Sequence, residues 1–228
     1  MSDRGPCVSQ ECLARVGLAT RVPPFPAALE GRFLRLEPVV PERDCEALFA
    51  ASNGSDANGR PGAYDAELRI WRYMFGGPYA DPAEFLAYLQ ALLSNPIGLA
   101  LCVSDKASGR KIGLATYCNN VPKFLSIELG GIWYNPDFHR TYANSETMLL
   151  MLSHAFETLG YRRLEWKCDS LNKPSRTAAL RLGFQFEGIF RQHMIVKGRN
   201  RDTAWYAITD SQWPEVRQAL EARLYAGA

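Results

Sequence analysis

The stretch that decides the fold is residues 132–146, IWYNPDFHRTYANSE. It opens with apolar and aromatic residues typical of a strand, is interrupted by Asn135-Pro136, and continues into the start of a helix. A helix that begins directly behind a strand presents backbone N–H groups without partners and the positive end of its dipole. Such a turn can bind phosphate. The signal is weak by itself, because any strand-to-helix turn offers the same groups.

The residues that follow predict alternating helices and strands. Four apolar residues at spacings i, i+4, i+7 and i+11 predict a helix that Gly160 ends: Met148, Leu152, Ala155 and Leu159. Residues 164–168 alternate as a strand, and Pro174 opens a helix that runs to Leu182 and stops at Gly183. Further strands are expected at 184–187, 189–196 and 204–209, and a last helix at 213–224.

The residues that precede the 132–146 stretch predict first a segment with helices and then an antiparallel meander of strands. A short strand at 33–36 leads into a helix at 41–51, and Asp81-Pro82 has the N-cap and N1 residues of a second helix, which Asn95-Pro96 ends. Three strand-like runs follow at 98–103, 111–118 and 125–134. The order predicts a mixed α+β sheet with a crossover helix.

Length and composition favour an ordinary globular protein. The chain has 228 residues, of which 47% are hydrophobic and 11% aromatic, so low-complexity disorder is excluded. Residues 1–30 mix Pro, Gly and charge and are expected to form a flexible extension, with one domain over 31–228. No apolar run approaches the ~20 residues of a membrane helix, and the N-terminus is a poor secretory signal. We expect a cytoplasmic protein.

Cysteine and charge usage narrow the function classes. The six cysteines include no CxxC pair and lie far in sequence from the three histidines, which predicts reduced thiols and no metal site. The net charge of +2 argues against a protein that coats nucleic acid, yet residues 160–202 hold ten Lys/Arg against four Asp/Glu. This local excess favours a small phosphorylated ligand, and solvated charge at strand edges is an equal alternative.

Together, these motifs resemble the GNAT superfamily of acyl-CoA-dependent N-acetyltransferases. The most specific part is the pair of strings N-x-x-S-R at 172–176 and L-G-F-x-x-E-G at 182–188. The branch related to the ribosomal-protein alanine N-acetyltransferases (RimJ/RimL-like) is the most similar, and the resemblance covers about 31–224. It implies an α+β fold of three layers, in which helices flank a mixed, mostly antiparallel central sheet. This sheet is expected to splay between its fourth and fifth strands, with the pantetheine arm of acetyl-CoA in the gap.

The resemblance also implies which residues bind the donor. Strand four corresponds to 125–134, so the backbone of Ile132, Trp133 and Tyr134 is expected to pair with pantetheine, and Asn172 corresponds to a residue that contacts CoA in relatives. Asn172 is equally well placed as a helix cap. The phosphate loop is expected within one run of six residues: His139, Arg140, Thr141, Tyr142, Ala143 and Asn144.

This loop departs from the family motif Gln/Arg-x-x-Gly-x-Gly/Ala. With His139 in the first position, Tyr142 and Asn144 replace the glycines, whereas with Arg140 first, Ala143 and Ser145 do so. Neither register supplies a glycine, although relatives of this branch often carry a glycine-poor Gln-Arg-Thr loop. A direct ionic contact between Arg140 and a phosphate of CoA would compensate for the missing glycines.

Transfer of an acetyl group from acetyl-CoA to an amine needs a base that deprotonates the amine and a group that stabilises the departing thiolate. The resemblance makes Glu128 the candidate base and Ser175 the candidate thiolate-stabilising residue, against the alternatives of a satisfied carboxylate and a helix-surface serine. His139 and His193 are weaker candidate bases, and His154 is expected on an exposed helix flank with no role. Candidates to line the acceptor pocket, with core packing favoured for each, are Trp71, Tyr73 and Trp166.

The leading interpretation is transfer of an acetyl group from acetyl-CoA to a primary amine, on a protein N-terminus or a small molecule, by direct attack in a ternary complex. A protein of the same fold that binds acyl-CoA without turnover, as a sensor or partner module, is the main alternative. An RNA-associated module is a third, disfavoured because no nucleic-acid motif is present. The expected partners are a CoA thioester and an amine, with no membrane or metal, in a monomer or homodimer.

Overall fold

A computed structural model of the chain describes residues 8–18, 25–53, 67–94 and 98–225. Within them one sheet has the strand order β1-β2-β3-β4-β5-β6-β8-β7. Its strands are β1 (Leu29–Glu30), β2 (Leu34–Pro38), β3 (Leu99–Asp105), β4 (Lys111–Val121), β5 (Ser126–Tyr134), β6 (Arg163–Asp169), β7 (Gln185–Val196) and β8 (Arg199–Thr209). Only β5 and β6 pair in parallel among these strands. The predicted mixed, mostly antiparallel sheet is confirmed.

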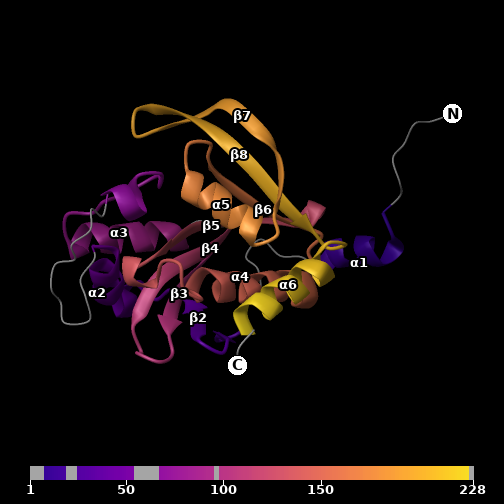
Figure 1. Cartoon of the computed structure of the whole chain (residues 1–228), viewed down its shortest axis with the longest axis horizontal. Coiled ribbons are helices and arrows are strands. Elements are labelled where there is room, and N and C mark those ends of the chain that lie inside the picture. The colour runs from indigo at the N-terminus through magenta and orange to yellow at the C-terminus, as the bar shows by residue number, and fades with distance from the viewer. Residues whose placement is uncertain (1–7, 19–24, 54–66, 95–97, 226–228) are drawn as a thin grey trace.

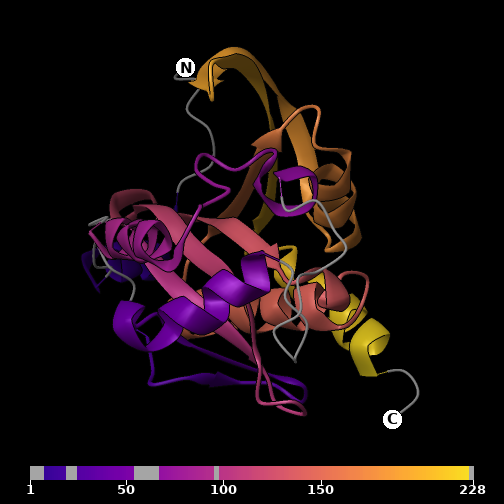
Figure 2. The ribbon, with the colours of Figure 1, turned by 90° about the vertical axis from the view of Figure 1, so that its left-hand side faces the viewer.

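Helices cover both faces of the sheet (Figures 1 and 2). They are α1 (Gln10–Leu18), α2 (Pro41–Ser52), α3 (Pro82–Leu93), α4 (Ala143–Ser153), α5 (Lys173–Arg181) and α6 (Trp213–Tyr225). Shorter turns are η1 (Glu67–Trp71), η2 (Pro122–Phe124), η3 (Pro136–Phe138) and η4 (His154–Thr158). Figure 2 shows α2 and α3 on the face opposite α4 and α6. Among the described residues, no helix is long and apolar enough to cross a membrane.

The predicted helix boundaries follow from local chemistry. The Asp81 carboxylate accepts a hydrogen bond from the backbone N–H of Glu84 at 2.9 Å, and Pro82 opens α3. At C-terminal ends, Gly160 (φ 68°) after η4 and Gly183 (φ 94°) after α5 adopt the left-handed conformation that stops a helix. The predicted stop at Asn95-Pro96 lies outside the described residues.

Two hydrophobic clusters, one on each side of the sheet, form the core. One joins the strands to α4, α5 and α6, and includes Ile127 and Leu129 of β5. The other joins them to α2 and α3, and includes Trp71 and Trp133. Because side chains alternate along a strand, Glu128 lies on the face opposite Ile127 and Leu129.

The parallel pairing of β5 with β6 is short. It comprises three residue pairs, from Ser126 opposite Arg163 to Glu128 opposite Glu165. Beyond Glu128, β5 continues to Tyr134 without a further partner on β6 among the described residues. This is the expected splay between the fourth and fifth strands, here β5 and β6 because the short β1 precedes them.

Within the segment 1–30, described residues contact the rest of the protein: α1 buries Cys12 to 5% exposure, Arg15 donates to the carbonyl of Gly160 at 3.1 Å, and β1 pairs with β2. The division of the chain at residue 30 stays a prediction. The expectation that His154 is exposed is wrong. His154 is buried at 6% exposure because η4 turns it inward, where its ring meets that of Phe25 edge-on at 5.2 Å. An apolar side of the N-terminal segment therefore completes the core.

Candidate active site

A β-bulge lies in β5 beside the splay. Leu114 pairs with Trp133 and Thr116 with Gly130, so β5 has one more residue than β4 over this interval. Gly131 adopts φ 59°, which favours glycine. The bulge interrupts the ladder immediately before residues 132–134. Trp133 and Tyr134 still pair with Leu114 and Gly113 of β4, but no residue of β6 pairs with them among the described residues. The pantetheine pairing expected on this side of β5 stays a prediction.

Glu128 is buried, at 7% exposure, and one of its oxygens is held firmly. Oε2 accepts a hydrogen bond from Asn119 Nδ2 at 2.6 Å and lies 2.9 Å from Lys167 Nζ. The other oxygen, Oε1, lies beside Gly130, where an added Cβ would come within 3.3 Å of it. Two contacts therefore hold Oε2 of Glu128, while Oε1 lies beside Gly130, next to the bulge.

Lys167 joins two carboxylates across the splay. Its Nζ also lies 2.8 Å from Glu165 Oε2, and it sits 3.9 Å from the centre of the Trp205 ring. Burial disfavours the charged lysine, but Glu128 and Glu165 outweigh it and raise the pKa of Lys167. The ammonium is therefore charged at neutral pH.

The ion pairs continue along β6 and into β7. Arg163 contacts Glu165 at 2.8 Å and Glu187 at 2.7 Å. We call the alternating series the charge ladder: Glu128, Lys167, Glu165, Arg163 and Glu187. Two basic residues of the 160–202 segment are thus neutralised by carboxylates, which accounts for part of its charge without a phosphate ligand.

Ser175 lies in α5, which packs against the face of β6 opposite the charge ladder. Asn172 is the N-cap of α5, since its Oδ1 accepts from the backbone N–H of Ser175 at 3.1 Å. The Ser175 hydroxyl oxygen accepts from Trp166 Nε1 at 3.0 Å, which leaves the hydroxyl hydrogen able to donate elsewhere. Trp166 is buried against Phe184 at 5.6 Å between ring centres. Trp166 therefore orients Ser175 and does not share a face with Glu128.

The other two aromatic candidates lie in and after η1. Trp71 is fully buried in the α2–α3 cluster, so in this structure it is a core residue with no surface open to an acceptor. Tyr73 is half-buried, and its hydroxyl donates to the carbonyl of Leu171 at 3.2 Å. Lys197, near the tip of the β7–β8 hairpin, donates to the carbonyls of Trp71 at 2.8 Å and Gly77 at 2.6 Å. The segment after η1 is thereby fastened to the hairpin.

The expected phosphate loop connects η3 with α4. The Nε2 of His139 lies 3.0 Å from the carbonyl oxygen of Tyr134. Burial lowers the pKa of His139, and the charges of Arg69 and Arg140 lower it further, against that hydrogen bond. Arg140 has φ 63°, and the Thr141 hydroxyl donates to the Phe138 carbonyl at 2.8 Å. The loop is thus shaped by a left-handed arginine rather than by glycine.

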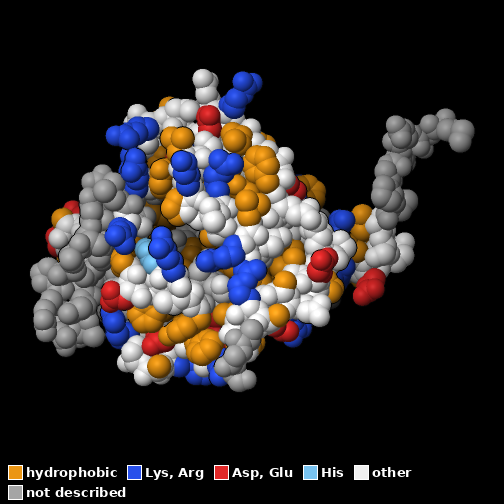
Figure 3. Space-filling view, viewed as in Figure 1, with side chains coloured by type: hydrophobic (Ala, Val, Ile, Leu, Met, Phe, Trp, Pro, Cys, Tyr) orange, Lys and Arg blue, Asp and Glu red, His pale blue; other side chains and the backbone are white. Residues whose placement is uncertain are grey.

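The next three side chains turn into the protein. The Tyr142 hydroxyl donates to Asp105, Ala143 is fully buried, and Asn144 Oδ1 accepts from the Tyr134 hydroxyl at 3.4 Å. Only their backbone is then suited to phosphate. Figure 3 shows Lys and Arg side chains gathered between the β7–β8 hairpin and the α4–α6 layer, which makes this face suited to an anion.

Sequence reasoning missed four residues near the site. Asn119 and Lys167 contact the Glu128 carboxylate, Trp205 contacts Lys167, and Arg69 contributes positive charge beside His139. The alternation Arg163-x-Glu165-x-Lys167 was the one available signal, because it places three charges on a single face of a strand. Their partners lie on other strands and have no local signature.

Comparison with known proteins agrees with this geometry. Residues 34–185 match the model of the acetyltransferase (GNAT) domain family. A crystal structure of a GCN5-related N-acetyltransferase from Brucella melitensis is 42% identical, covers 90% of this chain and 91% of its own, and superposes with a TM-score of 0.81. The chain belongs to the GNAT family of N-acetyltransferases.

Two more distant relatives extend the comparison. The uncharacterized N-acetyltransferase YoaA of Bacillus subtilis (strain 168) is 24% identical over 171 residues, which is 74% of this chain and 89% of that protein. Mycobacterium smegmatis RimJ, in complex with CoA-disulfide, is 22% identical and covers 83% of this chain and 88% of its own, with a TM-score of 0.66. At that identity RimJ shares the fold.

Proposed function

We propose that this chain transfers the acetyl group of acetyl-CoA to a primary amine by direct attack within a ternary complex. The observation that carries the proposal is the position of Glu128, a buried carboxylate with its Oε1 beside Gly130 at the point where β5 and β6 part. GNAT membership supports acetyl transfer and acetyl-CoA as the donor.

Each step of the transfer has a candidate group. Glu128 Oε1 takes a proton from the acceptor ammonium, and the resulting amine nitrogen attacks the thioester carbonyl. Backbone N–H groups near the β5 bulge stabilise the oxyanion. The C–S bond then breaks, the nitrogen loses its second proton, and the departing thiolate sulfur takes up this proton through the Ser175 hydroxyl, whose oxygen Trp166 holds. Proximity supplies much of the rate enhancement.

The donor would be held by three groups of residues. The backbone of Ile132, Trp133 and Tyr134 would pair with pantetheine, and Asn172 would contact CoA besides capping α5. The pyrophosphate would meet the backbone N–H groups that open α4, with Arg140 and Arg69 supplying charge. The RimJ structure with CoA-disulfide supports the capacity of this fold to hold CoA.

The acceptor is a protein N-terminus or a small amine. The sequence resemblance to the RimJ/RimL-like branch supports peptides with a free N-terminus as part of the first acceptor panel, alongside simple alkylamines and diamines. This resemblance and the RimJ fold relation are the support for that choice.

The test measures acetyl-CoA binding by calorimetry and CoA release across the acceptor panel. We expect Arg140→Ala and Asn172→Ala to weaken acetyl-CoA binding, and Glu128→Gln to lower kcat by ~100-fold or more with binding retained. Glu157→Gln, at an exposed glutamate of η4, is the matched control and should behave as wild type. Binding without turnover of any amine would favour the sensor alternative, and no binding at millimolar acetyl-CoA would refute the donor assignment.

A further inference from the structure

Lys167 lies at the narrowest part of the splay. Glu128 and Glu165 are the last directly opposed pair of β5 and β6, and Lys167 follows two residues later on β6, on the same face as Glu165. It reaches back to β5, so that its Nζ contacts both carboxylates at 2.9 and 2.8 Å. Its side chain is 12% exposed, which makes this a nearly buried ion pair.

Two opposed carboxylates at this depth need a cation between them. Unpaired, they would repel each other, and at least one would be driven towards its neutral, protonated form. Lys167 neutralises them, and the Trp205 ring 3.9 Å from Nζ adds a favourable cation–π contact on the other side. The lysine thereby joins Glu128 of β5 to Glu165 of β6.

The same contact fixes the direction of the carboxylate. Lys167 and Asn119 both bind Oε2, the latter at 2.6 Å. With Oε2 held from two strands, Oε1 is directed to the space beside Gly130, where the absence of a side chain leaves room. A Cβ at Gly130 would also come within 2.9 Å of Cys118 Sγ, so a larger residue does not fit without movement.

We propose that Lys167 is a positioning residue for the transfer reaction: its ammonium, with the Asn119 amide, holds Glu128 Oε2 in place and turns Oε1 towards the acceptor amine. Lys167 itself contacts neither substrate. The inference rests on the proposed role of Glu128 as base, and it adds a requirement for a cation on β6.

Steady-state kinetics of Lys167→Met, Lys167→Arg and Asn119→Gly test this role. Methionine keeps the length of the side chain without its charge, and we expect kcat to fall roughly 10- to 100-fold with the calorimetric Kd for acetyl-CoA unchanged. Lys167→Arg keeps the positive charge, so it should retain part of the kcat that Lys167→Met loses. Asn119 has φ 48°, so glycine removes the amide without backbone strain, and kcat should fall about tenfold.

A matched control is Lys111→Met. Lys111, the first residue of β4, also pairs with a buried carboxylate, that of Asp44 in α2, and this pair makes no ion pair with the charge ladder among the described residues. It should lower the stability of the fold and leave kcat near the wild-type value. This control separates loss of a buried ion pair from loss of catalytic positioning.

The outcomes distinguish the two proposals. Full activity of Glu128→Gln would remove the base assignment and the role of Lys167 with it. A severe loss in Glu128→Gln alongside wild-type kcat in folded Lys167→Met and Asn119→Gly would leave the base in place and overturn the positioning role. If Lys167→Met does not fold, Asn119→Gly decides the question alone. Equal losses of kcat in Lys167→Met and Lys111→Met would also refute it, since they would mark a general effect of destabilisation.

Discussion

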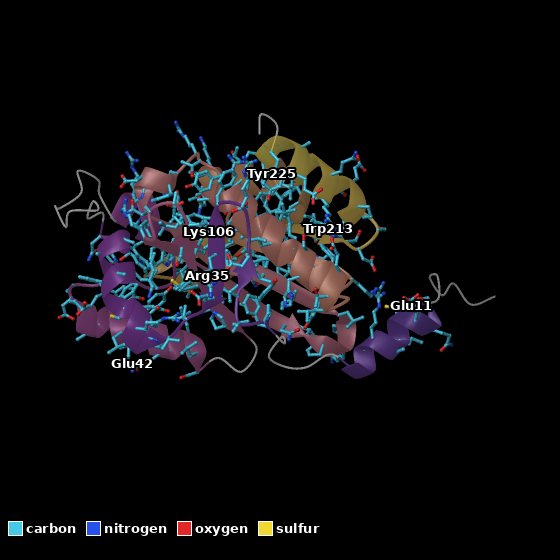
Figure 4. The ribbon with its side chains drawn as sticks, turned by 90° about the horizontal axis from the view of Figure 1, so that it is seen from below. Glu11, Arg35, Glu42, Lys106, Trp213 and Tyr225 are labelled. Atoms are coloured by element: carbon cyan, nitrogen blue, oxygen red, sulfur yellow. The ribbon has the colours of Figure 1, made fainter. Side chains whose placement is uncertain are left out.

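Replacing Glu146 with alanine should destabilise the protein strongly, because this fully buried carboxylate binds three consecutive backbone amides. Its oxygens accept from the N–H groups of Arg32 at 2.8 Å, Phe33 at 2.9 Å and Leu34 at 2.7 Å. The hydroxyl of Tyr225, at the end of α6 in Figure 4, adds a fourth contact at 3.2 Å. One side chain in the first turn of α4 thus joins the start of β2 to the last helix.

The magnitude follows from the groups left without partners. A buried donor that loses its acceptor costs about 1–3 kcal/mol. The Leu34 amide is buried and those of Arg32 and Phe33 are partly buried, so the three together predict a loss of roughly 3 kcal/mol. For a domain of this size that corresponds to a fall in Tm of about 6–12 °C. The assay is urea unfolding followed by circular dichroism. Glu42→Ala is the control, because Glu42 is also in the first turn of a helix but is exposed, and it should cost at most ~1 kcal/mol.

A double-mutant cycle with Gly31 tests the geometry itself. A Cβ at Gly31 would lie 2.6 Å from the Glu146 carboxyl carbon, so Gly31→Ala must displace the carboxylate from its amides. In the Glu146→Ala background this obstacle is absent, and Gly31→Ala should be nearly neutral, within about 0.5 kcal/mol. Additive effects of the two substitutions, or a cost of Glu146→Ala below about 0.5 kcal/mol, would refute the contact.

Three further outcomes are expected. Asp81→Ala removes the N-cap of α3 and should cost about 1 kcal/mol in urea unfolding. Burial opposes ionisation of Asp44, but hydrogen bonds from Arg43 and Lys111 prevail and hold its pKa below the usual value. The contribution of Asp44 to stability is therefore present above about pH 4 and lost as the pH falls further. Asp44→Asn should be less stable than wild type at pH 7, and its stability should depend less on acid pH. Burial, with Asp44 nearby, raises the pKa of Cys102 to about 12, so iodoacetamide at pH 8 should leave this thiol unmodified in the native protein by mass spectrometry.

The secondary structure was predictable because its signals are local. Asp81-Pro82, Gly160 and Gly183 each set a boundary through the conformation of one or two residues, and the structure places helix ends there. Residues 10–18 lack such a signal. Their helix is stabilised by its contacts with the rest of the protein, since Cys12 enters the core and Arg15 donates to the Gly160 carbonyl. Tertiary contacts of this kind outweigh weak local propensity.

The candidate site was predictable only in part for the same reason. Glu128 and Ser175 came from resemblance to a family, whereas the partners of Glu128 depend on strand register. Lys167 meets Glu128 because β5 and β6 run in parallel with Glu128 opposite Glu165, and a shift of one residue would turn Lys167 to the other face. No pattern within either strand specifies that register.

The two halves of the proposed chemistry are linked through adjacent residues of β6. Trp166 points to the α5 side and holds the Ser175 hydroxyl, while Lys167 points to the other side and holds the Glu128 carboxylate. Because strand side chains alternate, one dipeptide orients the proposed thiolate-stabilising group on one face and the proposed base on the other. In the proposed mechanism the position of β6 relative to β5 sets both groups together, so a change in the splay should alter amine attack and thiolate departure in the same enzyme variant.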